Sequence, residues 1–311
     1  MELEQIIRRQ DGVVTRAQAL ESLTTGALQH RLGRHWQIAL PGVYLTSTGA
    51  PTDRQRLRAA LLYGGSSAQL ADATALAAYG ARYLPADSTI RLLLPASERR
   101  VNRDGVVVRR THRLPTARTI DGLPYSPPAR ALADFAARIG DDRTATAVIA
   151  DAVQRRLVDR RSVLEELTHV TGRGAAVANR VAKWVAAGAL SAPEAEFLAL
   201  CERSKVLPTP LINPLLELPS GQRFSPDALF VDAGLVHETN GRDGHAADDR
   251  FDDMQARHRA MTAAGFVVLH SSPRQLRTTP SQVLAELEAC YRQRAGTGMP
   301  PDVRLLRREA A

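Results

Sequence analysis

The stretch FSPDALFVDAGLVHETNG, residues 224–241, decides the fold of the C-terminal part of the chain. Its apolar residues predict two strands that are joined by a turn at residues 232–234. A two-residue loop would place Asp227 opposite Asn240 with Glu238 on the same face, and a three-residue loop would shift this pairing by one. Carboxylates within strands need compensation, which a divalent cation supplies. Because Mg²⁺ binds through one or two carboxylates with waters and substrate phosphates, Asp227 and Glu238 are candidate ligands for Mg²⁺ or Mn²⁺.

The segment before this hairpin predicts a helix that opens with Ser191-Ala-Pro-Glu194 and runs to about residue 204. At about 100° per residue, Glu194 falls on the apolar stripe of this helix, together with Phe197, Leu198 and Cys201. Two interpretations of this carboxylate stay open. Glu194 closes a capping box with Ser191, or it projects into a cleft as a ligand of a metal or a water.

The segment after the hairpin predicts a helix that carries Phe251, Met254, His258 and Met261 on one stripe and ends at Gly265. Residues 266–269 follow as a buried strand, so helix, hairpin, helix and strand form an α/β sheet with one crossover. A closing helix is expected over residues 281–294. The tail from Gly296 is expected to be a mobile basic end.

This order of elements and the spacing Pro226-Asp227…Glu238-Thr-Asn240 resemble the PD-(D/E)XK nuclease superfamily. Residues 191–291 are more closely similar to the relatives of the very-short-patch-repair (Vsr-type) endonucleases. The resemblance implies a restriction-endonuclease-like domain whose site is formed by Glu194, Asp227, Glu238, residue 240 and His245.

One of these positions departs from the family pattern. Asn240 stands where the family usually has aspartate. Asparagine can coordinate a metal through its carbonyl, but it brings no charge and cannot act as a base, so the metal would bind more weakly and the site could be degenerate. His245 is the candidate general base or hydrogen-bond donor, and its alternative is a surface loop histidine.

The N-terminal part predicts short helices over residues 2–10, 16–21 and 26–32, followed by strands at 36–40 and 43–45. This is the order of a winged helix-turn-helix. The third helix and the residues after it would present side chains that can contact phosphates or base edges, namely Thr25, Gln29, His30, Arg31 and Arg34. The alternative is a small α+β unit whose polar helix face is only solvated.

A second resemblance favours DNA binding. Residues 12–20, with Arg31-Leu32, Trp36 and residues 41–44, resemble the N-terminal domain of abortive-infection (AbiE-type) antitoxins. That resemblance implies DNA binding and autorepression.

The middle of the chain predicts helices and strands, with a hairpin formed by residues 90–94 and 106–110. Arg99, Arg100 and Arg103 lie in its loop and form either a solvated surface or a ridge that contacts phosphates. The expected class is therefore α+β multidomain. Its segments are a winged helix at 1–50, an α/β middle region at 51–188, the endonuclease-like domain at 189–295 and a flexible tail at 296–311.

Composition limits the classes of protein. Hydrophobic residues make up 44% and charged residues 24%, which is ordinary for a globular chain. The chain has no apolar run long enough for a membrane span and no signal peptide at its start, and its two cysteines are far apart. A cytoplasmic protein is expected. The net charge of +8 is concentrated before residue 191, where it would attract nucleic acid.

These features predict a DNA-binding protein that hydrolyses DNA phosphodiester bonds with Mg²⁺ or Mn²⁺, in defence or DNA processing. The expected partners are double-stranded DNA and a cognate toxin or defence partner, with no membrane. The alternative is a non-enzymatic, antitoxin-like transcription regulator with a degenerate nuclease fold, for which Asn240 is the best argument. An RNA-acting nuclease is disfavoured, because aromatic residues make up only 5% and no stacking platform is evident.

Overall fold

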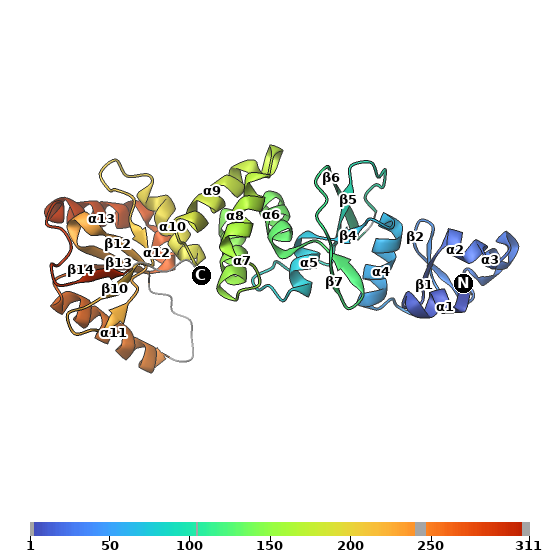
Figure 1. The fold of residues 1–311 in the computed structure, drawn as a ribbon, viewed down its shortest axis with the longest axis horizontal. Coiled ribbons are helices and arrows are strands. Elements are labelled where there is room, and N and C mark those ends of the chain that lie inside the picture. The colour runs from blue at the N-terminus through green and yellow to red at the C-terminus, as the bar shows by residue number, and fades with distance from the viewer. Residues whose placement is uncertain (1–2, 104, 240–246, 307–311) are drawn as a thin grey trace. The chain divides into compact units, whose positions relative to one another are not determined.

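The computed structural model describes residues 3–103, 105–239 and 247–306, with the backbone alone over 247–254 (Figure 1). Its contacts divide the chain into two units. The first comprises Met1–Arg138 and Arg156–Val170, and the second comprises Ile139–Arg155 and Thr171–Ala311. Helices and sheets occur in both, so the α+β class is confirmed. This division is coarser than the four predicted segments, and the predicted boundary at residue 188 falls inside the second unit.

The N-terminal elements of the first unit alternate short helices with a small antiparallel sheet of order β1-β3-β2. Thr15 and Thr24 accept backbone N–H groups at the starts of α2 and α3, which explains why these two short helices begin there. Leu3, Leu28 and Trp36 are buried in the core beneath them. The elements are α1 (Leu3–Arg9), β1 (Val13–Thr15), α2 (Arg16–Leu20), α3 (Thr25–Arg31), β2 (Gln37–Leu40) and β3 (Val43–Leu45).

The rest of the first unit is built on a five-stranded sheet of order β6-β5-β4-β8-β7. The predicted hairpin of residues 90–94 and 106–110 is wrong, because β5 and β6 pair in parallel, Ile90 with Val106. The loop between them therefore crosses back along the sheet instead of turning tightly. The elements are α4 (Asp53–Gly64), β4 (Gln69–Leu70), α5 (Asp72–Ala78), β5 (Ile90–Pro95), β6 (Val106–Thr111), β7 (Arg118–Ile120), β8 (Leu123–Tyr125), α6 (Pro128–Ile139) and α8 (Arg160–Thr168).

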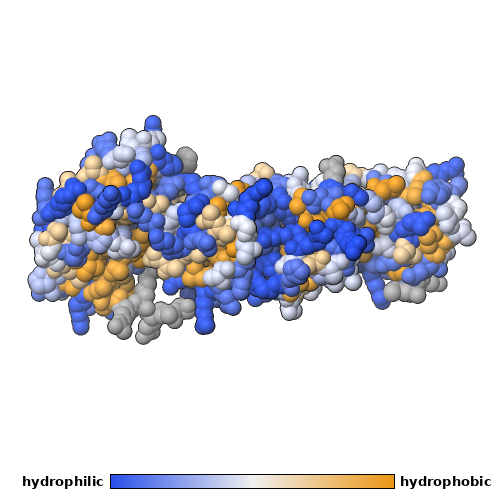
Figure 2. Space-filling view, turned by 90° about the horizontal axis from the view of Figure 1, so that it is seen from above, coloured by the Kyte–Doolittle hydropathy of each residue, from blue (hydrophilic) through white to orange (hydrophobic). Residues whose placement is uncertain are grey.

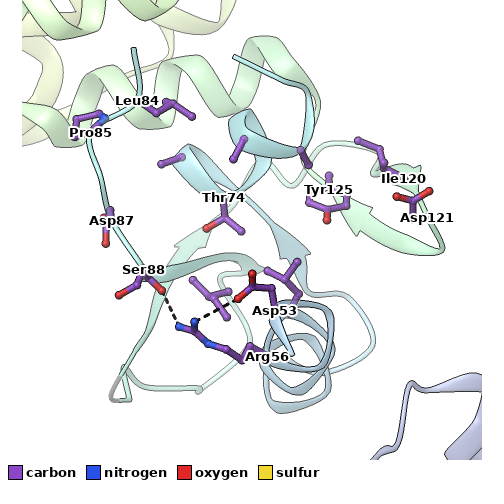
Figure 3. Close-up of a pocket in the computed structure, with 15 residues that line it drawn as sticks. Asp53, Arg56, Thr74, Leu84, Pro85, Asp87, Ser88, Ile120, Asp121 and Tyr125 are labelled. Atoms are coloured by element: carbon purple, nitrogen blue, oxygen red, sulfur yellow. Dashed lines mark hydrogen bonds and ion pairs between the residues drawn. The ribbon is translucent and has the colours of Figure 1, made fainter. Parts of the chain in front are cut away.

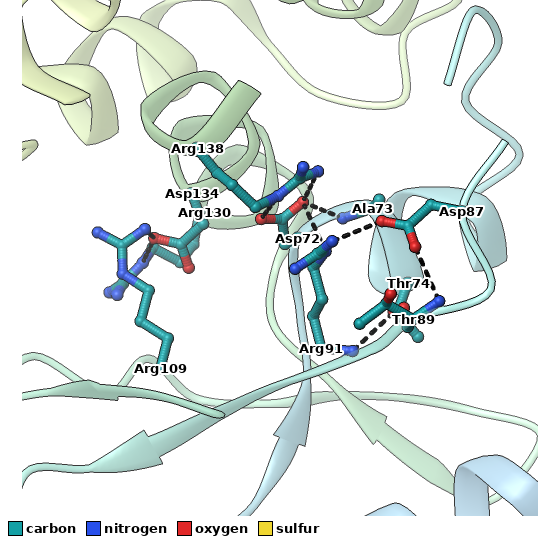
Figure 4. Close-up of polar contacts among 10 residues, drawn as sticks. All are labelled: Asp72, Ala73, Thr74, Asp87, Thr89, Arg91, Arg109, Arg130, Asp134 and Arg138. Atoms are coloured by element: carbon teal, nitrogen blue, oxygen red, sulfur yellow. Dashed lines mark hydrogen bonds and ion pairs between the residues drawn. The ribbon is translucent and has the colours of Figure 1, made fainter. Parts of the chain in front are cut away.

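Ion pairs with two buried carboxylates, Asp72 and Asp134, connect α6 to α5 and to β6 (Figure 4). Both carboxylate oxygens of Asp72 accept hydrogen bonds from Arg138, at 2.7 and 2.8 Å. Asp134 pairs with Arg130 and with Arg109, each at 2.9 Å. Arg109 comes from β6, so this contact connects β6 to α6, although the Arg109 side chain stays 44% exposed.

A cavity of about 590 Å³ lies in the first unit beside α4 and α5 (Figure 3). Its charged rim is internally paired, since Arg56 contacts Asp53 at 3.6 Å and donates to the carbonyl of Ser88 at 3.1 Å. On the face in Figure 2, apolar residues form small groups among hydrophilic ones. Among the described residues, no helix combines the length and apolarity that a membrane span requires.

The second unit places a four-stranded sheet of order β14-β13-β12-β9 between helices (Figure 1). On one face, Met261 of α11 packs with Leu229 and Val236. On the other face, Phe197 of α10 stacks on His237, with ring centroids 3.9 Å apart. The elements are α7 (Asp142–Gln154), α9 (Ala175–Ala186), α10 (Ala192–Cys201), β9 (Leu211–Ile212), β12 (Ala228–Phe230), β13 (Leu235–Thr239), α11 (Ala247–Ala263), β14 (Val267–Ser271), α12 (Pro273–Thr278) and α13 (Pro280–Arg294).

The segment from Gly296 to residue 306 is not the free tail that the sequence predicts. The N–H groups of Gly296 and Gly298 donate to the carbonyl of Asp232, and Val303 is buried in the core. β15 (Arg304–Leu306) then pairs with β10 (Leu215–Glu217), which also pairs with β11 (Arg223–Phe224). The apolar residues of this segment complete a core, so they stay ordered.

Candidate functional site

The pairing of β12 with β13 determines which carboxylates meet. Ala228 pairs with His237 and Phe230 with Leu235, so the same register places Asp227 opposite Glu238. The predicted pairing of Asp227 with Asn240 is wrong. The connection is longer than expected, because Val231–Ala233 forms a 3-10 turn and Gly234 follows in the left-handed conformation.

Asp227, which is half-buried, and Glu238, which is buried, form a mutually repelling pair. The carboxylate of Asp227 accepts the backbone N–H of Thr239 at 2.6 Å. Burial, with a smaller contribution from the charge of Glu194, raises the pKa of Asp227 to about 6. Burial likewise raises the pKa of Glu238 to about 7, with the charge of Asp227 adding to the effect. Both shifts mean that a positive charge placed between these carboxylates would be stabilised.

Glu194 takes the capping role, the first of the two interpretations that the sequence left open. It caps the start of α10, because it accepts the N–H of Leu190 at 2.8 Å and the hydroxyl of Ser191 at 2.7 Å. It also lies near enough to Asp227 to raise the pKa of that carboxyl. The cap therefore holds Glu194 at the border of the Asp227–Glu238 pair.

Asn213 links these groups, and the sequence analysis missed it. Its side-chain amide donates to Glu194 at 2.5 Å and to the carbonyl of Gly188 at 3.2 Å. Its backbone N–H donates to the carbonyl of Asp227 at 3.0 Å. The residue has a φ of 49°, which asparagine tolerates better than most residues. The Asn213-Pro214 dipeptide is a turn signal that could have drawn attention to it.

Arg257 supplies the positive charge at the site. Its guanidinium donates to Glu238 at 3.1 Å and to the carbonyl of Ser225 at 3.3 Å. Its charge lowers the pKa of both Asp227 and Glu238, although burial outweighs it at each. This ion pair joins α11 to β13.

Two further histidines lie beside the pair. His270 of β14 pairs in register with Glu238, and its Nε2 lies 2.7 Å from Nδ1 of His258 on α11. His258 is half-buried. The predicted site residues Asn240 and His245 lie outside the described residues.

The donor chemistry of the pair fits a magnesium-type ion but not a three-ligand protein cage. In the part of the chain that the structure describes, no group of three His, Cys, Asp or Glu side chains could hold a metal. Two carboxylates with raised pKa values match the sparse oxygen ligation of Mg²⁺. Asp227 and Glu238 are therefore the residues that could hold Mg²⁺ or Mn²⁺.

The residues expected to contact DNA lie at the surface of the first unit. On and after α3, Thr25, Gln29, His30 and Arg34 are exposed, whereas Arg31 is half-buried with its guanidinium 5.4 Å from the Trp36 ring centre. Nη1 of Arg34 lies 2.6 Å from Nε2 of His30. In the β5–β6 loop, Arg99, Arg100 and Arg103 are exposed, and Arg100 lies over the ring of Tyr63.

Comparisons with known proteins provide little beyond this geometry. No protein-family model matches the chain, and no curated protein matches it. Among solved structures, the chain is similar to the crystal structure of the RV2827C protein from Mycobacterium tuberculosis, with 18% identity over 66% of this chain and 82% of that chain, at a TM-score of 0.44. A likeness this slight carries no argument about function.

Proposed function

We propose that this chain binds double-stranded DNA and hydrolyses its phosphodiester bonds with a divalent metal ion held by its C-terminal unit. The observation that carries the proposal is the pairing of half-buried Asp227, just before β12, with buried Glu238 near the end of β13, and Glu194 at its border. Burying like charges together is costly for folding alone, and such clusters are concentrated at functional sites. The arrangement of α10, the β12–β13 hairpin, α11 and β14 agrees with the endonuclease-like order expected from the sequence.

The three carboxylates would have two tasks in this mechanism. Asp227, held by the N–H of Thr239, and Glu238 would hold Mg²⁺ or Mn²⁺. When bound, the ion supplies a water of lowered pKa and a positive charge beside the phosphate. Glu194 would orient a water, because Asn213 and the start of α10 restrain its carboxylate. His245 remains the residue that we expect to transfer a proton.

DNA binding is supported by the N-terminal elements. The order α1-β1-α2-α3-β2-β3 with a three-stranded antiparallel sheet is typical of a winged helix. Thr25, Gln29, His30 and Arg34 on and after α3 are then placed to contact base edges and phosphates. Arg99, Arg100 and Arg103 would add phosphate contacts.

A second candidate function is a non-enzymatic, antitoxin-like regulator of transcription that retains a nuclease-like fold. The observation that favours it is the ion pair of Arg257 with Glu238, which neutralises one carboxylate without a metal. Asn240 in place of an acidic residue favours it too. Such a protein would bind one promoter fragment specifically and would need no Mg²⁺.

The test is cleavage of supercoiled and linear duplex DNA by the purified chain with Mg²⁺, Mn²⁺ or EDTA. We expect metal-dependent cleavage that is lost in D227N and E238Q, while both variants still shift DNA in a gel. E286Q is the matched control, because Glu286 is an exposed carboxylate on α13. Cleavage that persists in both site variants would refute the site, and a specific promoter shift without any cleavage would favour the regulator.

A further inference from the structure

Arg257 reaches the carboxylate pair from the crossover helix. α11 connects the parallel strands β13 and β14, and it carries Arg257 next to the end of β13. The guanidinium makes two contacts, one to Glu238 at 3.1 Å and one to the carbonyl of Ser225 at 3.3 Å. Ser225 lies two residues before Asp227, and Glu238 lies on β13. Arg257 therefore contacts the chain both before β12 and on β13.

The two partners of this ion pair differ in exposure. The side chain of Glu238 is 11% exposed, whereas that of Arg257 is 45% exposed. Among the side chains that the structure describes, the guanidinium makes both contacts through the same nitrogen, Nη2. A guanidinium has five N–H donors in a planar fork, so one that is half exposed retains donors for a phosphate. The buried carboxylate, in contrast, has little access to water.

The position of Arg257 conflicts with a cation at the same carboxylate. Two positive charges within about 4 Å repel each other by several kcal/mol at the effective dielectric of a protein surface. A divalent cation at Glu238 would therefore displace the guanidinium outward, toward solvent, where its side chain is already 45% exposed. Arginine is the side chain whose geometry best matches phosphate oxygens.

We propose that Arg257 is a displaceable counter-ion, which neutralises Glu238 before the metal binds and then contacts the scissile phosphate. This inference rests on the proposed function, because it assigns a second role at the same site. A purely structural Arg257 would only tie α11 to the hairpin. The two roles predict opposite effects on metal affinity, since removing a competitor strengthens binding and loosening a scaffold weakens it.

The experiment is calorimetric titration of the full chain with Mn²⁺ alone, comparing wild type, R257Q, R257K and D227N. R257Q should bind Mn²⁺ about tenfold more tightly than wild type, because one competing charge is removed. R257K, which retains the charge, should stay close to wild type. R259Q is the matched control, because Arg259 is an exposed arginine on the same helix, and it should leave the affinity unchanged. R257M, which keeps the apolar stem, replaces R257Q if that variant does not fold.

Single-turnover DNA cleavage at saturating Mn²⁺ tests the second half of the inference. R257Q should cleave at least about tenfold more slowly than wild type despite its tighter metal binding, because a phosphate contact is lost. Unchanged or weaker Mn²⁺ affinity in R257Q would overturn the counter-ion role, and cleavage at the wild-type rate would overturn the phosphate contact. If folded wild type and R257Q both fail to bind Mn²⁺, the proposed function and this inference fail together. Mn²⁺ binding that D227N abolishes and R257Q leaves unchanged overturns this inference alone.

Discussion

Asp227 and Glu238 lie opposite each other where β12 and β13 begin to separate, and the N–H of Thr239 holds the carboxylate of Asp227 at 2.6 Å. Neither carboxylate gains full compensation from Arg257, because the pKa of each stays raised. The pair therefore binds protons more readily than exposed carboxylates do. Any metal cation that binds the pair must compete with these protons.

Metal affinity should accordingly rise with pH. Mn²⁺ binds the deprotonated carboxylates, whose pKa values are raised to about 6 for Asp227 and about 7 for Glu238. The association constant should increase from about pH 5 and level off near about pH 8, as the protons are released before binding. Calorimetry in buffers of different ionisation enthalpy would measure both the affinity and the protons released. A flat affinity profile across this range would contradict the prediction.

Removing Arg34 should weaken DNA binding without changing sequence preference. Its exposed guanidinium follows α3 and would contact a phosphate. R34A should lower the slope of log affinity against log salt by about 1, because one fewer counterion is released. Fluorescence anisotropy with labelled duplexes at several salt concentrations measures this slope. R8A is the control, since Arg8 on α1 is 82% exposed, and an equal loss in R8A would show a general charge effect.

Loss of the Asn213 amide should destabilise the second unit. N213G keeps a residue that tolerates the φ of 49° but removes the hydrogen bonds to Glu194 and Gly188. The free energy of unfolding should fall by about 1–3 kcal/mol, because two half-buried acceptors lose their donor. N213A should lose about 1 kcal/mol more through backbone strain. Urea unfolding of both variants separates the two causes, and equal values for N213G and wild type would exclude the linking role.

Asp87 should stabilise the first unit in a defined pH range. Hydrogen bonds from Thr89 and the charge of Arg91 lower the pKa of Asp87 from 3.8 to about 2. A depressed folded-state pKa gives stability that is present above the unfolded value and is lost as pH falls through the folded value. Wild type should therefore be more stable than D87N above pH 3.8, and the difference should vanish toward about pH 2. Thermal unfolding at a series of pH values would show it, and a difference independent of pH would contradict the assignment.

Gly234 should tolerate no side chain. A Cβ there would lie 2.6 Å from the carbonyl oxygen of Gly298, and the φ is 54°. G234A should lower the free energy of unfolding by about 2–4 kcal/mol, because a backbone clash adds to the strain. G221A is the matched control, since Gly221 has a φ of 80° and open space around it. If both variants lose the same stability, strain alone is responsible and the packing of Gly298 contributes nothing.

Local signals in the sequence predicted much of the fold. Thr15 and Thr24 mark the starts of α2 and α3. Such starts can be predicted from sequence because an N-cap side chain bonds a backbone N–H only three residues further on. The helix from Ser191 and the hairpin around Gly234 were expected for the same reason. The parallel pairing of β5 with β6 was missed, since a loop of this length permits either strand direction.

The site was predictable in its residues but not in its pairings. Asp227 and Glu238 are conspicuous as charged residues in an apolar stretch. The register that pairs them depends on the 3-10 turn at residues 231–233. The alternation of apolar and polar residues along the strands does not predict such a turn. The partners Asn213 and Arg257 come from distant segments, and their contacts exist only once the sheet has formed. The strand at Arg304–Leu306 was missed because its partner lies far away in the sequence.

The chain enters each of its two units twice, since Ile139–Arg155 belongs to the second unit and Arg156–Val170 returns to the first. No single cut in the backbone therefore frees either unit with all of its parts. During synthesis the first unit cannot be complete until α8 has followed α7 out of the ribosome. In evolution, recombination cannot transfer either unit as one uninterrupted piece of gene. The two units must be inherited, exchanged and lost together.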